Sequence, residues 1–258
     1  MKIKSTVFVF LTFYFTLNVF SQTSVEEYIK NFKSTDWPLV KEAKENLENL
    51  QSKAIPSVVK LLDDNSVEKL EKTGSLIYPG ATKFYGHGQI IDYDIDKISV
   101  RAGWLLEDLT FQNFGFSGAH LPEKEDLISH IKITFPDYYN NSANRKKLEV
   151  SQLETIQELI IKLSVQKAKD WWEESKEGWR RLTALEDALK SFDEKRQVKA
   201  LFYIRNGKTK CYGLNKEYYL DHIAKEIARL SYSEIQRISE HASFILFDKQ
   251  FLWLEMKE

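Results

Sequence analysis

The sequence predicts an all-α protein, and three observations support this fold class. Apolar residues recur every three or four positions in several segments, which is the spacing of one buried helical face. Proline is scarce, and seven of the ten glycines fall between Gly74 and Gly118, so the rest of the chain has few residues that interrupt helices. Alternation with a period of two, which favours strands, is brief and is clearest over residues 91–95.

The first 21 residues are typical of a secretory signal peptide. Lys2 and Lys4 precede an uncharged apolar run from Val7 to Phe20, and a cut is expected ahead of Gln22. The run is shorter than the roughly 20 residues that a membrane-spanning helix needs, and this favours cleavage over retention as an anchor. We therefore expect a signal peptide at residues 1–21.

The mature chain, residues 22–258, is expected to form a single all-α domain that is periplasmic or secreted. It carries 35 basic and 38 acidic residues, because cleavage removes two lysines, and its densest basic block is Arg145-Lys146-Lys147. This balance does not favour a nucleic-acid partner. No later segment is long and apolar enough to cross a membrane. Cys211 is the only cysteine, so it is either a free buried thiol or a link to another chain.

Helix starts are predicted at four places along the chain. In a Ser-x-x-Glu pair, the hydroxyl accepts from a first-turn amide and the carboxylate reaches back, and such pairs begin at Ser24, Ser151 and Ser231. Asp36 before Trp37-Pro38 marks another start, because proline is tolerated in the first turn. The clearest apolar stripes are Ile95, Ile98, Ala102, Leu105 and Leu109; Leu153, Ile156, Ile160 and Leu163; and Leu220, Ile223, Ile227 and Leu230.

Several of the expected helices also resemble one another. Asp36 is followed by Val40-Lys41-Glu42-Ala43, Asp96 by Val100-Arg101-Ala102, and Asp193 by Val198-Lys199-Ala200. Together with AIPSVVKLLDD at residues 54–64, this pattern resembles HEAT repeats. The resemblance covers residues 36–64, 94–110 and 193–206.

This resemblance sets the expected architecture. Successive valines of the pattern are 60 and 98 residues apart, against roughly 40–47 in regular arrays. We therefore expect an irregular HEAT-like α-α superhelix with a long glycine- and aromatic-rich loop insertion near residues 73–93. The resemblance implies stacked helix pairs that bind other macromolecules, with no catalytic residues to carry over. Residues 86–116 also look like a segment of uncharacterised exported bacterial proteins, which implies no activity.

The segment Gly86–Asp96 holds a histidine and three aspartates and is the best candidate for a metal site. Counted from Asp92 as a calcium loop, the sixth position is Lys97 and the twelfth is Gly103, so the turn glycine and the bidentate acid are both missing. His87 has no second nitrogen or sulfur ligand nearby, as zinc would require. Both metal patterns therefore fail at named positions.

A structural role explains these aspartates better. Asp94 is placed to cap a helix that starts at Ile95, and Asp96 to lie in its first turn, where negative charge suits the helix dipole. Arg101 follows a little over one turn later and can pair with Asp96 or with an acid on a neighbouring helix. We predict capping, with no metal and no cofactor. The weaker alternative is a metal-dependent hydrolase that uses His87 with Asp92 and Asp94.

The stretch GFSGAH, Gly115–His120, has the composition of a nucleophile turn. It lacks the second glycine spacing of G-x-S-x-G and no predicted strand precedes it, which favours a loop between helices. The histidines His130, His222 and His241 have no Glu-x-x-His companion. We predict no catalytic residue.

Trp171, Trp172 and Trp179 lie within nine residues, beside Glu173 and Glu174. Aromatic platforms next to acids suit a carbohydrate site, and a glycosidase with paired carboxylates is one interpretation. Trp172 lies on an apolar stripe, however, and the other two can cover a helix corner, so packing is favoured.

The segment between Lys72 and Tyr93 has four glycines and no helical rhythm. Structureless loops longer than about 12–15 residues are usually functional or disordered, and the apolar content of this one argues for order. Its aliphatic residues are expected to pack on the helix from Ile95. Four residues are then candidates for an outward aromatic patch: Tyr78, Phe84, Tyr85 and His87. The alternative is that all of them pack inward and the loop plugs the end of the helical layer.

The leading hypothesis is an exported, non-catalytic helical-repeat module that binds a protein partner in a scaffold, inhibitor or immunity-type role. The candidate binding residues are Tyr78, Phe84, Tyr85, His87 and Trp171. The alternative is a carbohydrate-binding or carbohydrate-active protein that uses Trp171, Trp172 and Trp179.

Overall fold

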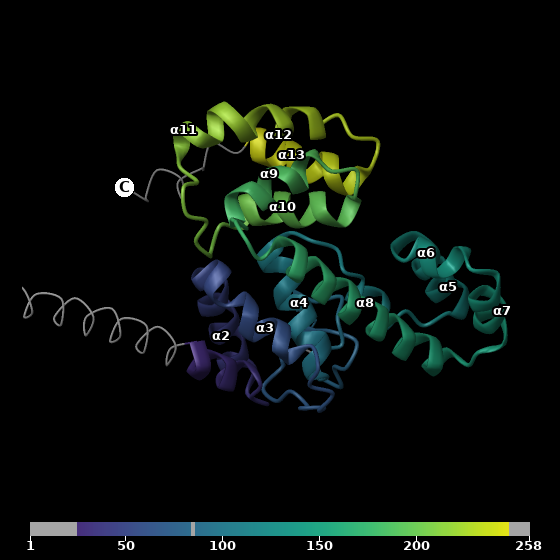
Figure 1. Ribbon diagram of the computed structural model, residues 1–258. Helices are drawn as coiled ribbons and strands as arrows, with labels where there is room; N and C mark the ends of the chain where they lie inside the picture. Colours follow the sequence, from purple (N-terminus) through teal and green to yellow (C-terminus); the bar gives the residue numbers. More distant parts are fainter. Residues whose placement is uncertain (1–24, 84–85, 248–258) are drawn as a thin grey trace, which may run out of the picture.

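The computed structural model describes residues 25–83 and 86–247, and these are mostly helical, so the all-α prediction is confirmed (Figure 1). The signal peptide expected at residues 1–21 lies outside the described residues. Residues 25–32 are helical. The α-helices that follow are α2 (Trp37–Leu50), α3 (Ile55–Leu61), α4 (Ile98–Thr110), α5 (Lys124–Thr134), α6 (Pro136–Asn140), α7 (Ser142–Val150), α8 (Leu153–Ser175), α9 (Arg181–Lys190), α10 (Glu194–Asn206), α11 (Lys216–Tyr218), α12 (Ala224–Leu230) and α13 (Gln236–Phe247). Shorter turns are η1 (Gln51–Lys53), η2 (Phe116–Gly118) and η3 (Tyr219–Ile223).

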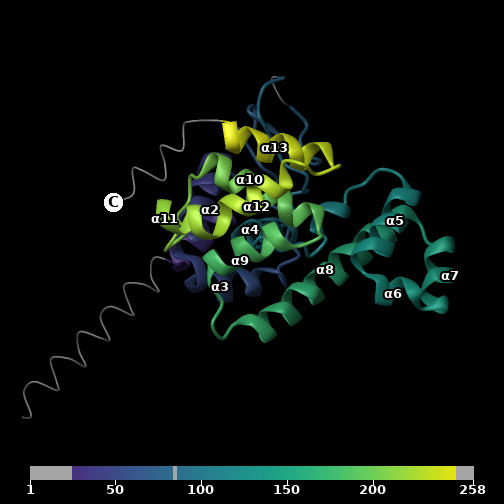
Figure 2. The same cartoon turned by 90° about the horizontal axis from the view of Figure 1, so that it is seen from above.

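Buried apolar side chains form three separate cores. The first lies beneath α2, α3, α4 and the loop after α3. The second lies between α9, α10, α12 and α13. The third joins α5 and α7 to the start of α8. Helix α8 connects two of them, because Ile156 and Ile160 belong to the third core and Ala168 to the first. Figures 1 and 2 both place α5, α6 and α7 at the far end of α8, apart from the other helices.

The predicted helix starts hold at Asp36 but not at the serines. Helix α2 begins directly after Asp36 with Pro38 in its first turn, as expected. Ser151 instead follows α7, where its hydroxyl donates to the Lys147 carbonyl at 2.7 Å. Ser231 likewise follows α12, where its hydroxyl donates to the carbonyl of Ala228 at 2.8 Å. Both serines therefore bond the last turn of the preceding helix and cap nothing. Ser24 lies outside the described residues.

The helix expected from Ile95 begins at Ile98 instead. The backbone of a neighbouring segment forms hydrogen bonds with groups near this point of the chain. The amide of Glu68 donates to the Asp96 carbonyl at 2.8 Å, and the Ile98 amide donates to the Ser66 carbonyl at 3.0 Å. Because the Asp96 carbonyl accepts from Glu68, it is not used in a helical turn, and α4 begins at Ile98.

The loop over residues 73–93 is anchored by two short parallel strands, β1 (Leu76–Ile77) and β2 (Gln89–Ile90). Leu76 and Ile91 are buried in the first core, which agrees with the expected packing of the aliphatic residues. Ile90 departs from it, because its side chain is exposed. Between the strands, Tyr78 is buried, while residues 82–83 and 86–88 are exposed.

Within residues 25–83 and 86–247, no helix combines the length and apolar character needed to cross a membrane.

Charged side chains join the first core to the second, in addition to Trp179, which packs against both. Asp108 of α4 accepts from Lys44 of α2 at 3.0 Å and from Lys199 of α10 at 2.7 Å. Lys44 also pairs with Glu48 in the next turn of α2. Arg181 of α9 reaches the Glu48 carboxylate at 3.3 Å. These five residues form an alternating chain of charges, called here the polar joint.

Candidate functional site

The residues proposed as an aromatic patch have different environments. Tyr78 is buried, and its hydroxyl donates to Asp96 Oδ1 at 3.0 Å, so this residue follows the inward alternative and does not belong to an outward patch. The physical reason is a partner distant in sequence: Asp96 accepts a bond that the phenol would otherwise make to water. Burial, together with this bond, raises the pKa of Tyr78. Phe84 and Tyr85 lie outside the described residues.

His87 and Trp171 are found on separate elements. His87 is exposed in the chain between β1 and β2. Trp171 is half-buried on α8, where its ring lies 5.4 Å from that of Phe114 and 6.0 Å from that of Trp172. The structure therefore does not gather the described members of the set into one surface.

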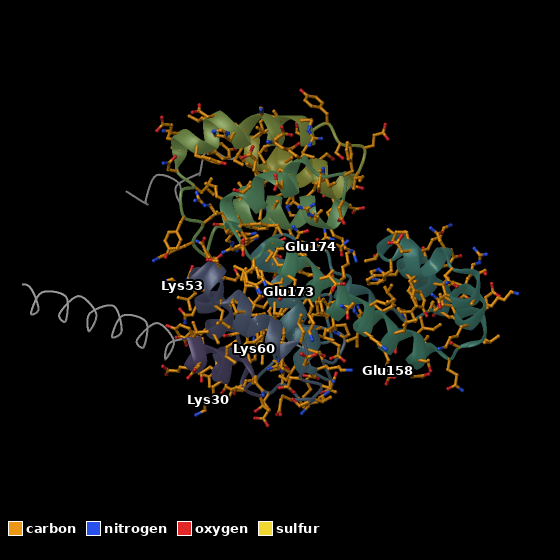
Figure 3. All side chains as sticks on the ribbon, in the orientation of Figure 1. Lys30, Lys53, Lys60, Glu158, Glu173 and Glu174 are labelled. Carbon is orange, nitrogen blue, oxygen red and sulfur yellow. The ribbon has the colours of Figure 1, made fainter. Side chains whose placement is uncertain are left out.

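The tryptophan cluster packs on the protein without being fully buried. Trp171 and Trp172 contact the first core, and Trp179 contacts both the first and the second. The indole nitrogen of Trp179 is buried with no hydrogen-bond partner among the described residues. Figure 3 shows the neighbouring Glu173 and Glu174 on the same helix, with Glu158 further along it.

Two of the three aspartates, Asp94 and Asp96, bind the backbone of a loop, so the capping prediction is wrong in detail. The N-cap of α4 is Lys97, and Asp94 instead accepts from the Asp96 amide at 3.4 Å. Asp96 is buried; besides the Tyr78 hydroxyl it accepts from the Leu70 amide at 2.8 Å. Among the described parts of the chain, no group of three or more His, Cys, Asp or Glu residues is arranged to hold a metal.

Arg101 is the centre of this anchor. Its guanidinium is fully buried and donates to four backbone carbonyls: those of Ile95 at 2.6 Å, Phe32 at 2.8 Å, Ser34 at 2.9 Å and Glu68 at 2.9 Å. Burial lowers its pKa to about 10, so it stays charged at neutral pH. The predicted salt bridge on one helix is thus replaced by a clamp on three chain segments.

Exposed aromatic side chains gather on a different part of the molecule, over α10 and α13. The rings of Phe202 and His241 lie 6.2 Å apart, edge to face. The Arg205 guanidinium lies 3.8 Å from the centre of the Phe244 ring and 3.4 Å from His241 Nδ1. Phe247 follows one turn after Phe244. These five residues are called here the α10–α13 patch.

The patch is open to solvent in spite of its apolar character. Phe202 is 56% exposed, Phe244 41% and Phe247 81%. Burial lowers the pKa of His241, and the positive charges of Arg205 and Arg237 lower it further, against Glu240. At neutral pH the imidazole is therefore uncharged, and the two arginines give the surroundings a positive field.

Sequence reasoning missed this patch, although a signal existed. On α13 the buried residues are Ile238, Ala242 and Ile245, so Phe244 and Phe247 lie off that stripe. Apolar residues beyond a complete buried stripe indicate a second contact surface. Figure 3 shows a differently composed surface over the first helices of the chain, where Lys30, Lys53 and Lys60 lie.

No protein-family model, curated protein or solved structure matches this chain. Its function is therefore inferred from its own residues.

Proposed function

We propose that this chain is an exported helical module that binds a protein partner through the α10–α13 patch. The observation that carries the proposal is the contact group of Phe202, Arg205, His241 and Phe244 with its rings open to solvent. Soluble proteins rarely expose contiguous apolar groups without a use for them, and such patches commonly mark interaction sites.

The composition of the patch suits a protein surface with apolar and acidic side chains. Aromatic rings and arginine are the residue types that carry most binding energy at interfaces. Arg205 already rests on the Phe244 ring and reaches His241, so part of the cost of ordering it is met before binding. The positive charges of Arg205 and Arg237 favour a partner that offers carboxylates around its apolar anchor.

The fold and location are part of the same proposal. We infer a HEAT-like stacking of helix pairs, interrupted by the 73–93 loop, because α10 follows Asp193 in the same Asp–Val–Lys–Ala pattern as α2 follows Asp36. Export through cleavage at residues 1–21 makes the partner an extracytoplasmic protein, in a scaffold, inhibitor or immunity-type role. Mass analysis of the protein from its native envelope should find a chain that begins at or near Gln22.

Pull-down of the tagged mature protein from a periplasmic extract tests the patch. Phe244→Ala should lose most of the captured partner while keeping the melting temperature within a few degrees. Phe192→Ala is the matched control, because Phe192 is fully exposed on the loop before α10, outside the patch. Equal capture by both variants would place the surface elsewhere.

Two further variants sharpen this experiment. His87→Ala tests the 73–93 loop, and unchanged capture is expected if the patch alone binds. A chain that ends at Phe247 removes the last eleven residues, which lie outside the described residues and are apolar in part. Capture by this shortened chain should match that of the full chain. Its loss would assign the binding to those residues instead.

Carbohydrate binding is the second candidate, and one observation favours it. Trp171, Trp172 and Trp179 remain partly exposed beside the exposed Glu173 and Glu174. A thermal-shift screen against a sugar library tests it. A sugar that raises the melting temperature of the wild type but not of Trp172→Ala would support this role, and a flat screen would reject it.

A further inference from the structure

The turn that contains Ser117 lies against the beginning of α10. Lys195 Nζ donates a hydrogen bond to Ser117 Oγ at 2.8 Å, although the two residues are 78 positions apart in the sequence. Ser117 is half-buried, and Lys195 is exposed as a whole residue, although protein atoms surround its amine closely enough to lower the pKa of that amine. A hydroxyl and an amine in direct contact are therefore accessible from solvent.

Two more titratable groups, His120 and Asp92, lie near Ser117 and Lys195. His120 follows the 3₁₀ turn Phe116–Gly118 that contains Ser117, and the charge of Lys195 lowers the pKa of its imidazole, which places it near that amine. Nδ1 of His120 is buried and has no hydrogen-bond partner within the described residues. Asp92 is near both His120 and Lys195, because its charge raises the pKa of each against the lowering effect of burial.

Buried groups fix the position of the turn at residues 114–118. Glu107, fully buried on α4, accepts the backbone amides of Phe114 at 2.8 Å and Gly115 at 2.9 Å. Gly115 has a φ of 106°, which a residue with a side chain rarely adopts. A Cβ on Gly118 would come within 2.2 Å of the His130 ring. Ser117 thus has a fixed position, as an attacking group requires.

We propose that Ser117 and Lys195 form a nucleophile–base pair that hydrolyses carboxylic esters. A serine hydroxyl is a weak nucleophile until an adjacent base removes its proton, and a lysine amine within hydrogen-bond distance is one such base. The ester class follows from the leaving group, because an alkoxide is less basic than an amide anion and leaves the tetrahedral intermediate more readily.

The reaction balances with no further reagent than water. Neutral Lys195 takes the Ser117 proton while Oγ bonds to the ester carbonyl carbon. The bond to the alcohol oxygen then breaks, and Lys195 returns the proton to that oxygen. Water next attacks the acyl-serine and gives a proton to Lys195, which passes it to Ser117 Oγ as the carboxylic acid leaves.

The surroundings of Lys195 support the neutral amine. Burial lowers its pKa most, and the charge of Lys199 lowers it further. Glu107, Asp193 and Asp92 raise the pKa of Lys195, and the charge of Lys195 in turn lowers the pKa of the nearby His120. The lowering effects prevail, so a larger share of the amine is unprotonated near neutral pH than for an ordinary lysine.

A fluorophosphonate probe, which modifies activated serines, tests the pair in the mature protein. Peptide mapping should find the adduct on Ser117, and Ser117→Ala should carry none and should lose hydrolysis of p-nitrophenyl acetate.

Lys195→Arg retains the charge but cannot act as a base, so labelling should slow about 10²-fold with an unchanged melting temperature. The labelling rate of the wild type should rise with pH through the lowered pKa of Lys195. Lys190→Arg, a surface lysine paired with Glu186, is the control and should label at the wild-type rate.

Three outcomes overturn the proposal. The first is an unmodified Ser117 in the folded protein when a reference serine hydrolase in the same tube is labelled. The second is an equal labelling rate in wild type and Lys195→Arg. The third is labelling without ester turnover above the Ser117→Ala background.

Discussion

Two arginines are fully buried in this protein, and their surroundings differ in kind. Arg101 donates only to backbone carbonyls, four in number, from the segments before α2, after α3 and before α4. Arg181 bonds the Glu48 carboxylate at 3.3 Å, the Thr209 hydroxyl at 3.1 Å and the Lys210 carbonyl at 3.0 Å. Its guanidinium also lies over the rings of Phe111 and Tyr203, at 5.3 Å and 4.8 Å.

The difference shows two ways to compensate a buried charge. Around Arg101, carbonyl dipoles replace water, and the result is the ordering of loops that have no regular structure of their own. Around Arg181, an opposite charge and two aromatic faces replace water, and the result is the attachment of α9 and α10 to α2. Arg101 thus orders the loops around the first core, and Arg181 joins the first core to the second.

Arg101→Met should have the largest effect, a loss of about 4 kcal/mol or more in the free energy of unfolding. Four buried carbonyls lose their donor at once, and each unsatisfied group costs roughly 1–3 kcal/mol unless water enters. Urea denaturation measures the loss, and hydrogen exchange should show the Glu68 and Leu70 amides losing protection first. A loss below about 1 kcal/mol would mean that the loops hold without this clamp.

Arg181→Lys should cost about 2–3 kcal/mol, because lysine keeps the charge but has neither the planar face nor the fork of donors. The Glu48 pair can persist, while the contacts to Phe111 and Tyr203 and the bonds to Thr209 and Lys210 are weakened. Urea denaturation of Arg181→Lys, of Glu48→Gln and of the variant with both substitutions gives the coupling between the two residues. A change smaller than about 0.5 kcal/mol in Arg181→Lys would show that charge alone matters at this position.

The sequence predicted local features of these regions but not their long-range contacts. Asp36 with Pro38 predicted the start of α2 because that rule depends only on adjacent residues. The partners of Arg101 come from residues 32, 34, 68 and 95, and no local pattern specifies such a set. The bond from Tyr78 to Asp96 was not predicted, for the same reason.

The exposure of the α10–α13 patch could not be predicted from the sequence either. The sequence placed apolar side chains on α10 and α13, but their exposure depends on which elements cover them. Phe202 and Phe247 stay open because the second core is already filled from the opposite faces of these helices. The bond between Ser117 and Lys195 also joins positions that no spacing rule connects.

The polar joint should give the protein a stability that depends on pH, with Asp108 as its main source. Burial raises the pKa of this carboxyl, but Lys199 and Lys44 outweigh it and bring the pKa down from 3.8 to about 2. The unfolded state then binds more protons between these values, so the stabilisation is complete above about pH 4 and is lost as pH falls toward 2. Its size is about 2 kcal/mol.

Comparison of the wild type with Asp108→Asn isolates this contribution. The difference in unfolding free energy should be about 2 kcal/mol at pH 7 and should shrink through pH 4 to nearly nothing at pH 2. A difference that stays constant over this range would assign the cost of the substitution to packing instead of charge.

The smallest expected effect is the difference in stability between two variants that each lose one hydroxyl, one in the Arg101 region and one beside Arg181. Tyr78→Phe takes a donor from the buried Asp96 carboxylate in the Arg101 region. Tyr203→Phe takes a donor from the Thr209 carbonyl, 2.9 Å away, and a weak bond to Cys211, but leaves the ring beneath Arg181 in place. Hydrogen bonds to charged acceptors contribute roughly 1.5–3 kcal/mol and neutral ones roughly 0.5–1.5. Tyr78→Phe should therefore cost about 1 kcal/mol more than Tyr203→Phe in urea denaturation. The reverse order would show that the Tyr203 hydroxyl, and not its aromatic face, supports the joint between the two cores.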